Sequence, residues 1–330
     1  MAASPAGDQN VAGEIRYERT VMNTRTAQTY LQTPTEVLST ADGVNFAYQR
    51  LGPGGDVPLV LAAYFASNMD DWDPLIVDGL ASDPEVITFD YPRVGGSTGV
   101  TPTTVPELTA SCLDFLRALN LTTVDFLGFS LGGMVAQQMA FDHPEVIRRM
   151  ILCGTGPRGG EKMTFTELSA EEQDPVLLLM NAFFTPSESS LSAGNAYLRR
   201  LSLRRTERDS PVTPTSADTQ LRAIREWGTI PASDRYAMLD AITQPALIVH
   251  GNKDIVVDPI NAVILAERLP NATLLALPDA SHGAQSQHAE VFFANARLFL
   301  NSRMRSERRT AGRGPGAPFS WSECRPRRAA

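Results

Sequence analysis

The stretch Leu127-Gly-Phe-Ser-Leu-Gly-Gly-Met-Val-Ala-Gln137, LGFSLGGMVAQ, sets Ser130 between glycines at the junction of an apolar run and a helical pattern. A G-x-S-x-G match alone is a weak signal, since chance supplies on the order of 0.1 matches in a chain of this length. Here the pentapeptide joins an expected strand at 123–128 to an expected helix at 131–143. Strand, sharp turn and helix are the context that makes such a serine an exposed nucleophile.

The glycines of this pentapeptide predict a tight turn. They let strand and helix approach closely and leave Ser130 at a strained apex, at the carboxyl edge of the sheet. The N-terminus of the following helix favours developing negative charge beside it.

A serine hydroxyl needs a base, and the base needs an orienting acid. Among the four histidines, His143 ends a helix, His250 lies inside an apolar strand, and His288 follows in a polar run. His282, in PDASHGAQ, falls just beyond the last expected strand, at the same edge as Ser130. We therefore predict His282 as the base.

The acid is expected in the loop GNKDIVVDP, directly after the strand PALIVHG. Asp254 stands where this loop leaves the strand. Asp258 precedes Pro259 and is better explained as the N-cap of the next helix. The sequence therefore favours Asp254.

The rest of the chain alternates apolar runs with helical patterns, which predicts a mostly parallel sheet covered by helices on both faces. Strands are expected at 35–40, 45–52, 57–65, 85–90, 123–128, 147–154, 245–251 and 272–279. Helices are expected at 106–120, 131–143, 259–270 and 290–304.

One long interruption predicts a helical cap. Between 157 and 241 no strand is convincing, and helical spacing occurs in PVLLLMNAFF, AGNAYLRRLSLRR and TQLRAIREW. The expected organisation is an N-terminal extension at 1–33, a core at 34–156 and 242–304, the cap at 157–241, and a disordered basic tail at 305–330.

Composition narrows the function classes. The 330 residues are 43% hydrophobic and carry a net charge of −8, although residues 301–330 hold eight Arg against two Glu. The acidic body argues against nucleic-acid binding. No apolar run is long enough to cross a membrane, and no targeting segment is recognisable, so a cytoplasmic protein is expected. Three scattered cysteines suggest neither disulfides nor a zinc site.

With these residues in the chain order Ser130, Asp254, His282, residues 35–304 resemble the capped α/β-hydrolases of the serine type. The resemblance implies an eight-stranded, mostly parallel sheet with a cap inserted after the sixth strand. Haloalkane dehalogenase and epoxide hydrolase chemistry is not expected, because those relatives use an aspartate where this chain has Ser130.

The resemblance also places an oxyanion site, with two departures. Many such hydrolases carry His-Gly after the third strand, where this chain has Ala63-Tyr64, and the next residue, Phe65, falls at the oxyanion position. The backbone N–H groups of Phe65 and Leu131 are the expected donors. The common Arg-Gly pair is also rearranged, as Pro92-Arg93.

The expected reaction is hydrolysis of a small or medium lipophilic carboxylic ester through an acyl-enzyme, on a small-molecule substrate and with no cofactor or metal. Candidate pocket residues are apolar, with helix core as the alternative for each. They are Phe65, Phe129, Met134, Met180, Phe183, Phe184, Trp227 and Tyr236.

Two alternatives stay open. Cofactor-free perhydrolases and C–C bond hydrolases use an equivalent triad, and a non-catalytic small-molecule-binding or accessory protein could keep the same fold. A literal G-x-G-x-x-G at 154–159 lacks the apolar helix that dinucleotide binding requires, and it is better read as the hinge into the cap.

Overall fold

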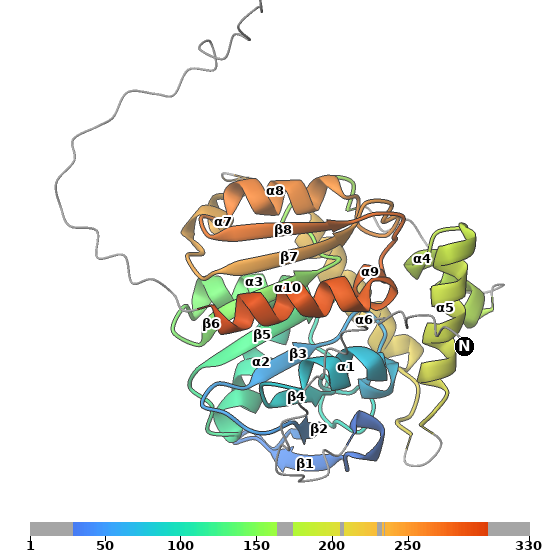
Figure 1. Ribbon diagram of the computed structural model, residues 1–330. Coiled ribbons are helices and arrows are strands. Elements are labelled where there is room, and N and C mark those ends of the chain that lie inside the picture. Colours follow the sequence, from blue (N-terminus) through green and yellow to red (C-terminus); the bar gives the residue numbers. More distant parts are fainter. Residues whose placement is uncertain (1–28, 164–173, 205–207, 230–232, 234, 303–330) are drawn as a thin grey trace, which may run out of the picture. The chain divides into compact units, whose positions relative to one another are not determined.

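The computed structural model describes residues 29–163, 174–204, 208–229, 233 and 235–302. They contain an eight-stranded sheet in the order β1-β2-β4-β3-β5-β6-β7-β8 (Figure 1). The strands are β1 Glu36–Ser39, β2 Asn45–Leu51, β3 Leu59–Ala62, β4 Val86–Phe89, β5 Val124–Phe129, β6 Ile147–Cys153, β7 Ala246–Gly251 and β8 Ala272–Leu277. The β1–β2 and β2–β4 pairs are antiparallel and all others are parallel, which confirms the mostly parallel sheet.

Helices cover both faces of this sheet. Figure 1 shows α1 and α10 in front of it, while α2 packs on α3 and α3 packs on β5 and β6. Their bounds are α1 Pro74–Leu80, α2 Val105–Ala118, α3 Leu131–Asp142, α8 Ile260–Arg268, α9 Ala284–Gln287 and α10 Ala289–Asn301. Three-residue 3₁₀ turns, η1 Tyr30–Gln32 and η2 Met69–Asp71, precede the first strand and α1.

Two helices of the core, α1 and α9, lie outside the expected set. α1 had a readable start signal, because Asp73 accepts a hydrogen bond from the N–H of Leu75 and Pro74 occupies the first helical position. α9 has four residues, too few for a hydrophobic period to show in the sequence.

β3 is shorter than the expected strand at 57–65. It ends at Ala62, and the chain then turns, with Ala66 at φ +54° and the Ser67 hydroxyl donating to the Tyr64 carbonyl at 2.7 Å. The apolar residues after Ala62 therefore form a loop at the carboxyl edge of the sheet.

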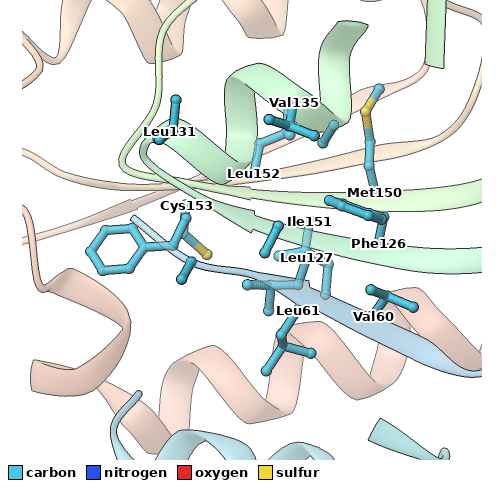
Figure 2. Close-up of a cluster of buried hydrophobic side chains, with 14 of the residues drawn as sticks. Val60, Leu61, Phe126, Leu127, Leu131, Val135, Met150, Ile151, Leu152 and Cys153 are labelled. Carbon is cyan, nitrogen blue, oxygen red and sulfur yellow. The ribbon is translucent and has the colours of Figure 1, made fainter. Parts of the chain in front are cut away.

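The centre of the sheet is the hydrophobic core. Figure 2 shows Val60 and Leu61 of β3 near Phe126 and Leu127 of β5 and Ile151 of β6, and all five are at most 1% exposed. Parallel strands covered on both faces read as continuous apolar runs, as these do. Burying one such side chain contributes about 1.5–3 kcal/mol, so this cluster firmly fixes the strands that carry the site.

A helical region is inserted after β6, as expected. Its described helices are α4 Pro175–Phe183, α5 Glu188–Leu201, α6 Pro214–Gly228 and α7 Ala237–Ala241. Figure 1 shows α4 and α5, in yellow-green, beyond the carboxyl edge of the sheet, whereas α7 lies at the other end and contacts α3 and α8. We call this region, from 157 to 241, the cap.

The described residues up to Leu300 form one compact unit, and of residues 301–330 only Asn301 and Ser302 are described. The expected N-terminal extension, up to residue 28, and the basic tail lie outside the described residues. Within the described ranges, no helix has both the length and the apolarity to cross a membrane.

Candidate active site

Ser130 stands at a sharp turn between β5 and α3. Its backbone has φ +53° and ψ −109°, a conformation that L-residues rarely adopt. Four hydrogen bonds hold it: its N–H donates to the Cys153 carbonyl at 2.9 Å, and its own carbonyl accepts from the N–H groups of Gly133 at 2.9 Å and Met134 at 3.3 Å and from the Thr155 hydroxyl at 2.8 Å. A strained conformation persists only when its surroundings enforce it, and these bonds do so.

The flanking glycines are required by space. A Cβ on Gly128 would stand 2.2 Å from the carbonyl oxygen of Gly132, and a Cβ on Gly132 would stand 2.1 Å from that of Ala62. Both obstacles are backbone atoms, which cannot rotate away. β3, β5 and α3 can therefore meet this closely only with glycine at these two positions.

His282 lies in the loop between β8 and α9. Its Nδ1 is 2.8 Å from Oδ2 of Asp254, and both side chains are almost completely buried. The imidazole also contacts the ring of Phe129, with centroids 5.1 Å apart. Because Phe129 directly precedes Ser130, this contact places the imidazole beside the turn that carries the serine.

Asp254 is held as a carboxylate. Its Oδ1 accepts from the N–H groups of Val256 at 2.8 Å and Val257 at 3.0 Å, which leaves Oδ2 for His282. Burial raises the pKa of Asp254, but the charge and hydrogen bond of His282, the nearby His250 and the Val257 N–H outweigh it, so the pKa is lowered.

A second histidine faces the same carboxylate. Nε2 of His250 is 2.9 Å from the Val257 carbonyl and 3.3 Å from Oδ2 of Asp254. A carbonyl oxygen only accepts, so Nε2 of His250 carries the proton. Burial lowers the pKa of His250 and keeps it neutral. Sequence analysis does not predict this contact with Asp254, because every residue of β7 is buried and an apolar run does not show which side chain His250 meets.

Asp258 has other partners. Its Oδ1 accepts from the N–H of Ile260 at 3.0 Å at the start of α8, and its Oδ2 binds Nζ of Lys162 at 2.6 Å. The hydrogen bond from Lys162 and that from Ile260 lower the pKa of Asp258. Asp258 therefore caps the start of α8, whereas Asp254 contacts the imidazole of His282.

The expected oxyanion donors belong to two elements that are bonded together. Leu131 is the first residue of α3, so its N–H has no acceptor within the helix. The next N–H, that of Gly132, donates to the Ala63 carbonyl at 3.1 Å and fixes the loop that carries Phe65 against α3. From the cap, Oε1 of Gln220 accepts from the Ala66 N–H at 2.8 Å.

Tyr64, at the position where many similar hydrolases carry glycine, packs among aromatic side chains. Its ring packs on those of Phe129 at 5.0 Å and Phe183 at 5.2 Å, and Phe183 also contacts His282 at 5.7 Å. The substitution therefore adds an aromatic ring to the wall beside His282.

Among the candidate pocket residues, Phe129 and Phe183 contact His282, while others have structural contacts. Phe184 packs on Tyr197 in the α4–α5 contact, and Trp227 donates from Nε1 to the Gly156 carbonyl at 3.2 Å. Met180 lies against Gly194 of α5, Tyr236 lies under the guanidinium groups of Arg235 and Arg268, Met134 is buried in α3, and Phe65 is half-buried.

The cap is bonded directly to the His282 loop. The His282 N–H donates to the Ala182 carbonyl at 3.2 Å, and the Gly283 N–H donates to the Phe183 carbonyl at 3.0 Å. On the same loop, the carboxylate of Asp279 accepts from the hydroxyls of Thr185 at 2.7 Å and Ser187 at 2.5 Å. We call this set of bonds the cap clasp. Sequence spacing missed it, because its members are about a hundred positions apart.

The G-x-G-x-x-G at 154–159 forms the turn that leads from β6 into the cap. Gly154 has φ +51° and Gly159 has φ +69°, and the Gly159 N–H donates to the Trp227 carbonyl at 2.8 Å. In the part of the chain that the structure describes, no three His, Cys, Asp or Glu side chains gather so as to hold a metal ion.

A protein-family model described as the alpha/beta hydrolase fold matches residues 57–289. The poly(3-hydroxyalkanoate) depolymerase of Ectopseudomonas oleovorans is 32% identical over 236 residues, 67% of this chain and 77% of that protein. A pimeloyl-[acyl-carrier protein] methyl ester esterase of Neisseria meningitidis is 28% identical over 247 residues, 69% of this chain and 72% of that protein. The solved alpha/beta hydrolase fold protein from Chitinophaga pinensis aligns with a TM-score of 0.79 at 37% identity, over 83% of this chain and 99% of that one.

Proposed function

The chain belongs to the alpha/beta hydrolase fold family, and from that premise we propose that it is a serine hydrolase that cleaves a carboxylic ester through an acyl-enzyme on Ser130. The observation that carries the proposal is the 2.8 Å contact between Nδ1 of His282 and Oδ2 of Asp254. A carboxylate only accepts hydrogen bonds, so Nδ1 carries the ring proton. Nε2 is then the basic nitrogen, free to take the proton of Ser130.

The reaction has two halves. In the first, Ser130 Oγ attacks the ester carbonyl while His282 takes its proton, and the imidazolium returns that proton to the departing alcohol. In the second, water attacks the acyl-enzyme with His282 as base, and the carboxylic acid leaves. Asp254 fixes the imidazole tautomer and stabilises its charged form.

The negative oxygen of each tetrahedral intermediate binds to the N–H groups of Phe65 and Leu131. The bond between Gly132 and Ala63 holds these two donors in fixed relation, and the positive end of the α3 dipole adds to them. A preformed donor pair of this kind needs no metal or cofactor to stabilise the charge.

The substrate proposed is a small or medium lipophilic ester. Tyr64, Phe129 and Phe183 supply an aromatic wall beside His282, which favours an apolar substrate group. The names of two relatives, a depolymerase of poly(3-hydroxyalkanoate) and a methyl ester esterase, support a substrate with a carboxylic acyl group.

The test is intact mass after exposure to a fluorophosphonate. The wild-type protein is expected to gain one adduct that the Ser130→Ala variant does not gain, and the wild-type protein should hydrolyse p-nitrophenyl esters of short acids. A folded wild-type protein that takes no adduct and cleaves no ester would refute the proposal and point to a binding protein of the same fold.

A further inference from the structure

A small cavity lies between α1, α5 of the cap and α9, next to the candidate active site. The volume that the centre of a water molecule can occupy in it is about 10 Å³, enough for one water or one hydroxyl group. Its apolar wall includes Phe129, which precedes Ser130, and Phe183, and both rings contact His282. The cavity is therefore built from the residues that surround the reacting groups.

Two side chains that line this cavity bury a polar atom without a hydrogen-bond partner among the described residues. One atom is Nε1 of Trp72 and the other is Oε1 of Gln285. Trp72 is 3% exposed and Gln285 is 4% exposed. A buried polar group without a partner is costly, so a pair of them lining one small cavity points to a missing ligand.

Other polar groups of the lining already have partners. The carboxylate of Asp73 accepts two hydrogen bonds from the Arg200 guanidinium, both at 2.7 Å. Oδ2 of Asp71 accepts from the Asn68 N–H at 2.9 Å, and the Tyr197 hydroxyl donates to the Asp71 carbonyl at 3.4 Å. The ligand must therefore satisfy the indole N–H and the amide oxygen.

These two atoms select the chemistry. The indole N–H only donates and the amide oxygen only accepts, so the ligand must accept one hydrogen bond and donate another. A hydroxyl group does both. A ketone cannot donate to Gln285, an ammonium cannot accept from Trp72, and a carboxylate would lie beside the acidic side chains of Asp71 and Asp73.

We propose that this cavity is a subsite for a hydroxyl group of the substrate, so that the preferred ester carries a hydroxyl besides its scissile bond. The hydroxyl accepts from Nε1 of Trp72 and donates to Oε1 of Gln285. Trp72 packs on Phe129 at 6.4 Å, and Gln285 follows His282 by three residues, so the subsite is tied to both the nucleophile and the base. The inference rests on the proposed ester hydrolysis.

The experiment compares each hydroxy ester with its deoxy counterpart. Methyl hydroxyhexanoates with the hydroxyl on carbon 3, 4, 5 or 6 test the acyl side, and hydroxyalkyl butyrates test the alcohol side. For one of these esters, wild-type kcat/KM should exceed that of the deoxy ester by about tenfold or more, the value of one well-made hydrogen bond pair. No preference in either series would overturn the proposal.

Variants locate the preference. Trp72→Phe keeps an aromatic ring but removes the N–H, and Gln285→Met keeps the length but removes the amide, so each should bring the hydroxy-to-deoxy ratio of kcat/KM close to one. Tyr91→Phe is the matched control, because the Tyr91 hydroxyl is also buried without a partner among the described residues but its ring packs on Phe89. It should leave the ratio at the wild-type value.

Binding to Ser130→Ala separates this inference from the proposed chemistry, because that variant cannot turn the ester over. Calorimetry should show the preferred hydroxy ester binding about tenfold more tightly than its deoxy form, and Trp72→Phe in that background should remove the difference. Equal binding of both esters would mean that the cavity holds only a resident water, and would overturn the subsite even if the protein hydrolyses esters.

Discussion

The loop of His282 is held from two sides, and the two sides use different kinds of contact. On the sheet side, a single charged side chain, Asp254, meets the imidazole at 2.8 Å. On the cap side, the main-chain carbonyls of Ala182 and Phe183 accept from the backbone of the loop. Any residue can supply a carbonyl, but only an acid supplies the charge that an imidazolium needs. In the proposed mechanism the sheet side therefore supplies the charge, while the cap holds the backbone of the loop.

The loop that carries Phe65 shows the same division. α3 binds it through backbone atoms, and the cap adds the amide of Gln220 on Ala66, whose φ of +54° needs support. The cap thus contacts both the loop of His282 and the loop of Phe65. Substitutions on the sheet edge should abolish turnover, and those in the cap contacts should reduce it.

The largest expected effect is that of Ser130→Ala. Loss of the nucleophile should lower kcat by about 10⁶-fold, as in other triad enzymes. Steady-state rates on a p-nitrophenyl ester measure this, with Ser82→Ala as control, since Ser82 is exposed and its hydroxyl bonds to the Gly79 carbonyl and the Arg297 guanidinium, neither of which belongs to the candidate site. Turnover near the wild-type rate would show that Ser130 is not the nucleophile.

Next come the two aspartates of one loop. Asp254→Asn should lower kcat by about 10⁴-fold, because an amide favours the wrong imidazole tautomer. Asp258→Asn should stay within about twofold, since Asn also caps a helix and the ion pair with Lys162 is exposed to solvent, which screens it. The reverse ranking in kcat would move the acid to Asp258.

The cap clasp should give a smaller loss. Asp279→Ala removes the acceptor for the hydroxyls of Thr185, Ser187 and Ser189, and it puts Ala at φ +47°. We expect kcat to fall by less than about tenfold, together with a lower Tm. Asn tolerates this φ, so the kcat and Tm of Asp279→Asn should lie between those of Asp279→Ala and the wild-type protein. A loss as large as that of Asp254→Asn would mean that the cap takes part in the chemistry.

The smallest effect concerns the contact of Asp209, in the cap, with the sheet edge. Its N–H donates to Oδ2 of Asp70 at 2.7 Å. Burial and the charge of Asp70 raise the pKa of Asp209 to about 6, although Arg204 and Arg208 oppose the shift. A raised carboxyl pKa means that the folded state holds its proton more firmly than the unfolded state does. The destabilisation therefore grows as the pH rises from about 4 and is complete above about 6.

Asp209→Asn should accordingly raise the Tm slightly at pH 8, and the difference from the wild-type protein should shrink at pH 5. Thermal unfolding at both pH values measures this. A variant that melts below the wild-type protein at pH 8 would show that attraction to Arg204 and Arg208 dominates at this contact.

Much of the fold was readable from the chain. The runs at 85–90, 123–128 and 245–251 are apolar because strands in the middle of a parallel sheet are covered on both faces, and each became a strand within a residue or two. The end of β3 was not readable, since the residues after Ala62 are as apolar as the strand itself. What ends the strand is the bond between Ala63 and α3, which local sequence does not show.

The candidate site divides in the same way. Ser130 follows a strand directly, and Asp254 and His282 lie in the loops after two later strands. Because parallel strands bring their carboxyl ends to one edge of the sheet, the sequence predicts that these three residues lie close together. The position of each residue along the chain therefore fixes its position at the edge of the sheet. Phe183 was expected in the pocket only as one of several apolar cap residues, because helix core and pocket lining share the same spacing.

What the sequence by itself determined is the order of strands and helices along the chain, the sharp turn at Ser130 and the loops of Asp254 and His282. These depend on local spacing and on backbone space at Gly128 and Gly132. What only the tertiary structure decided is how the cap contacts them. The support of His250 for Asp254, the cap clasp, and the cavity shared by Trp72 and Gln285 join residues that strand and helix periods do not relate. Such contacts arise when separate elements pack together, and the hydrophobic periodicity of the sequence does not predict them.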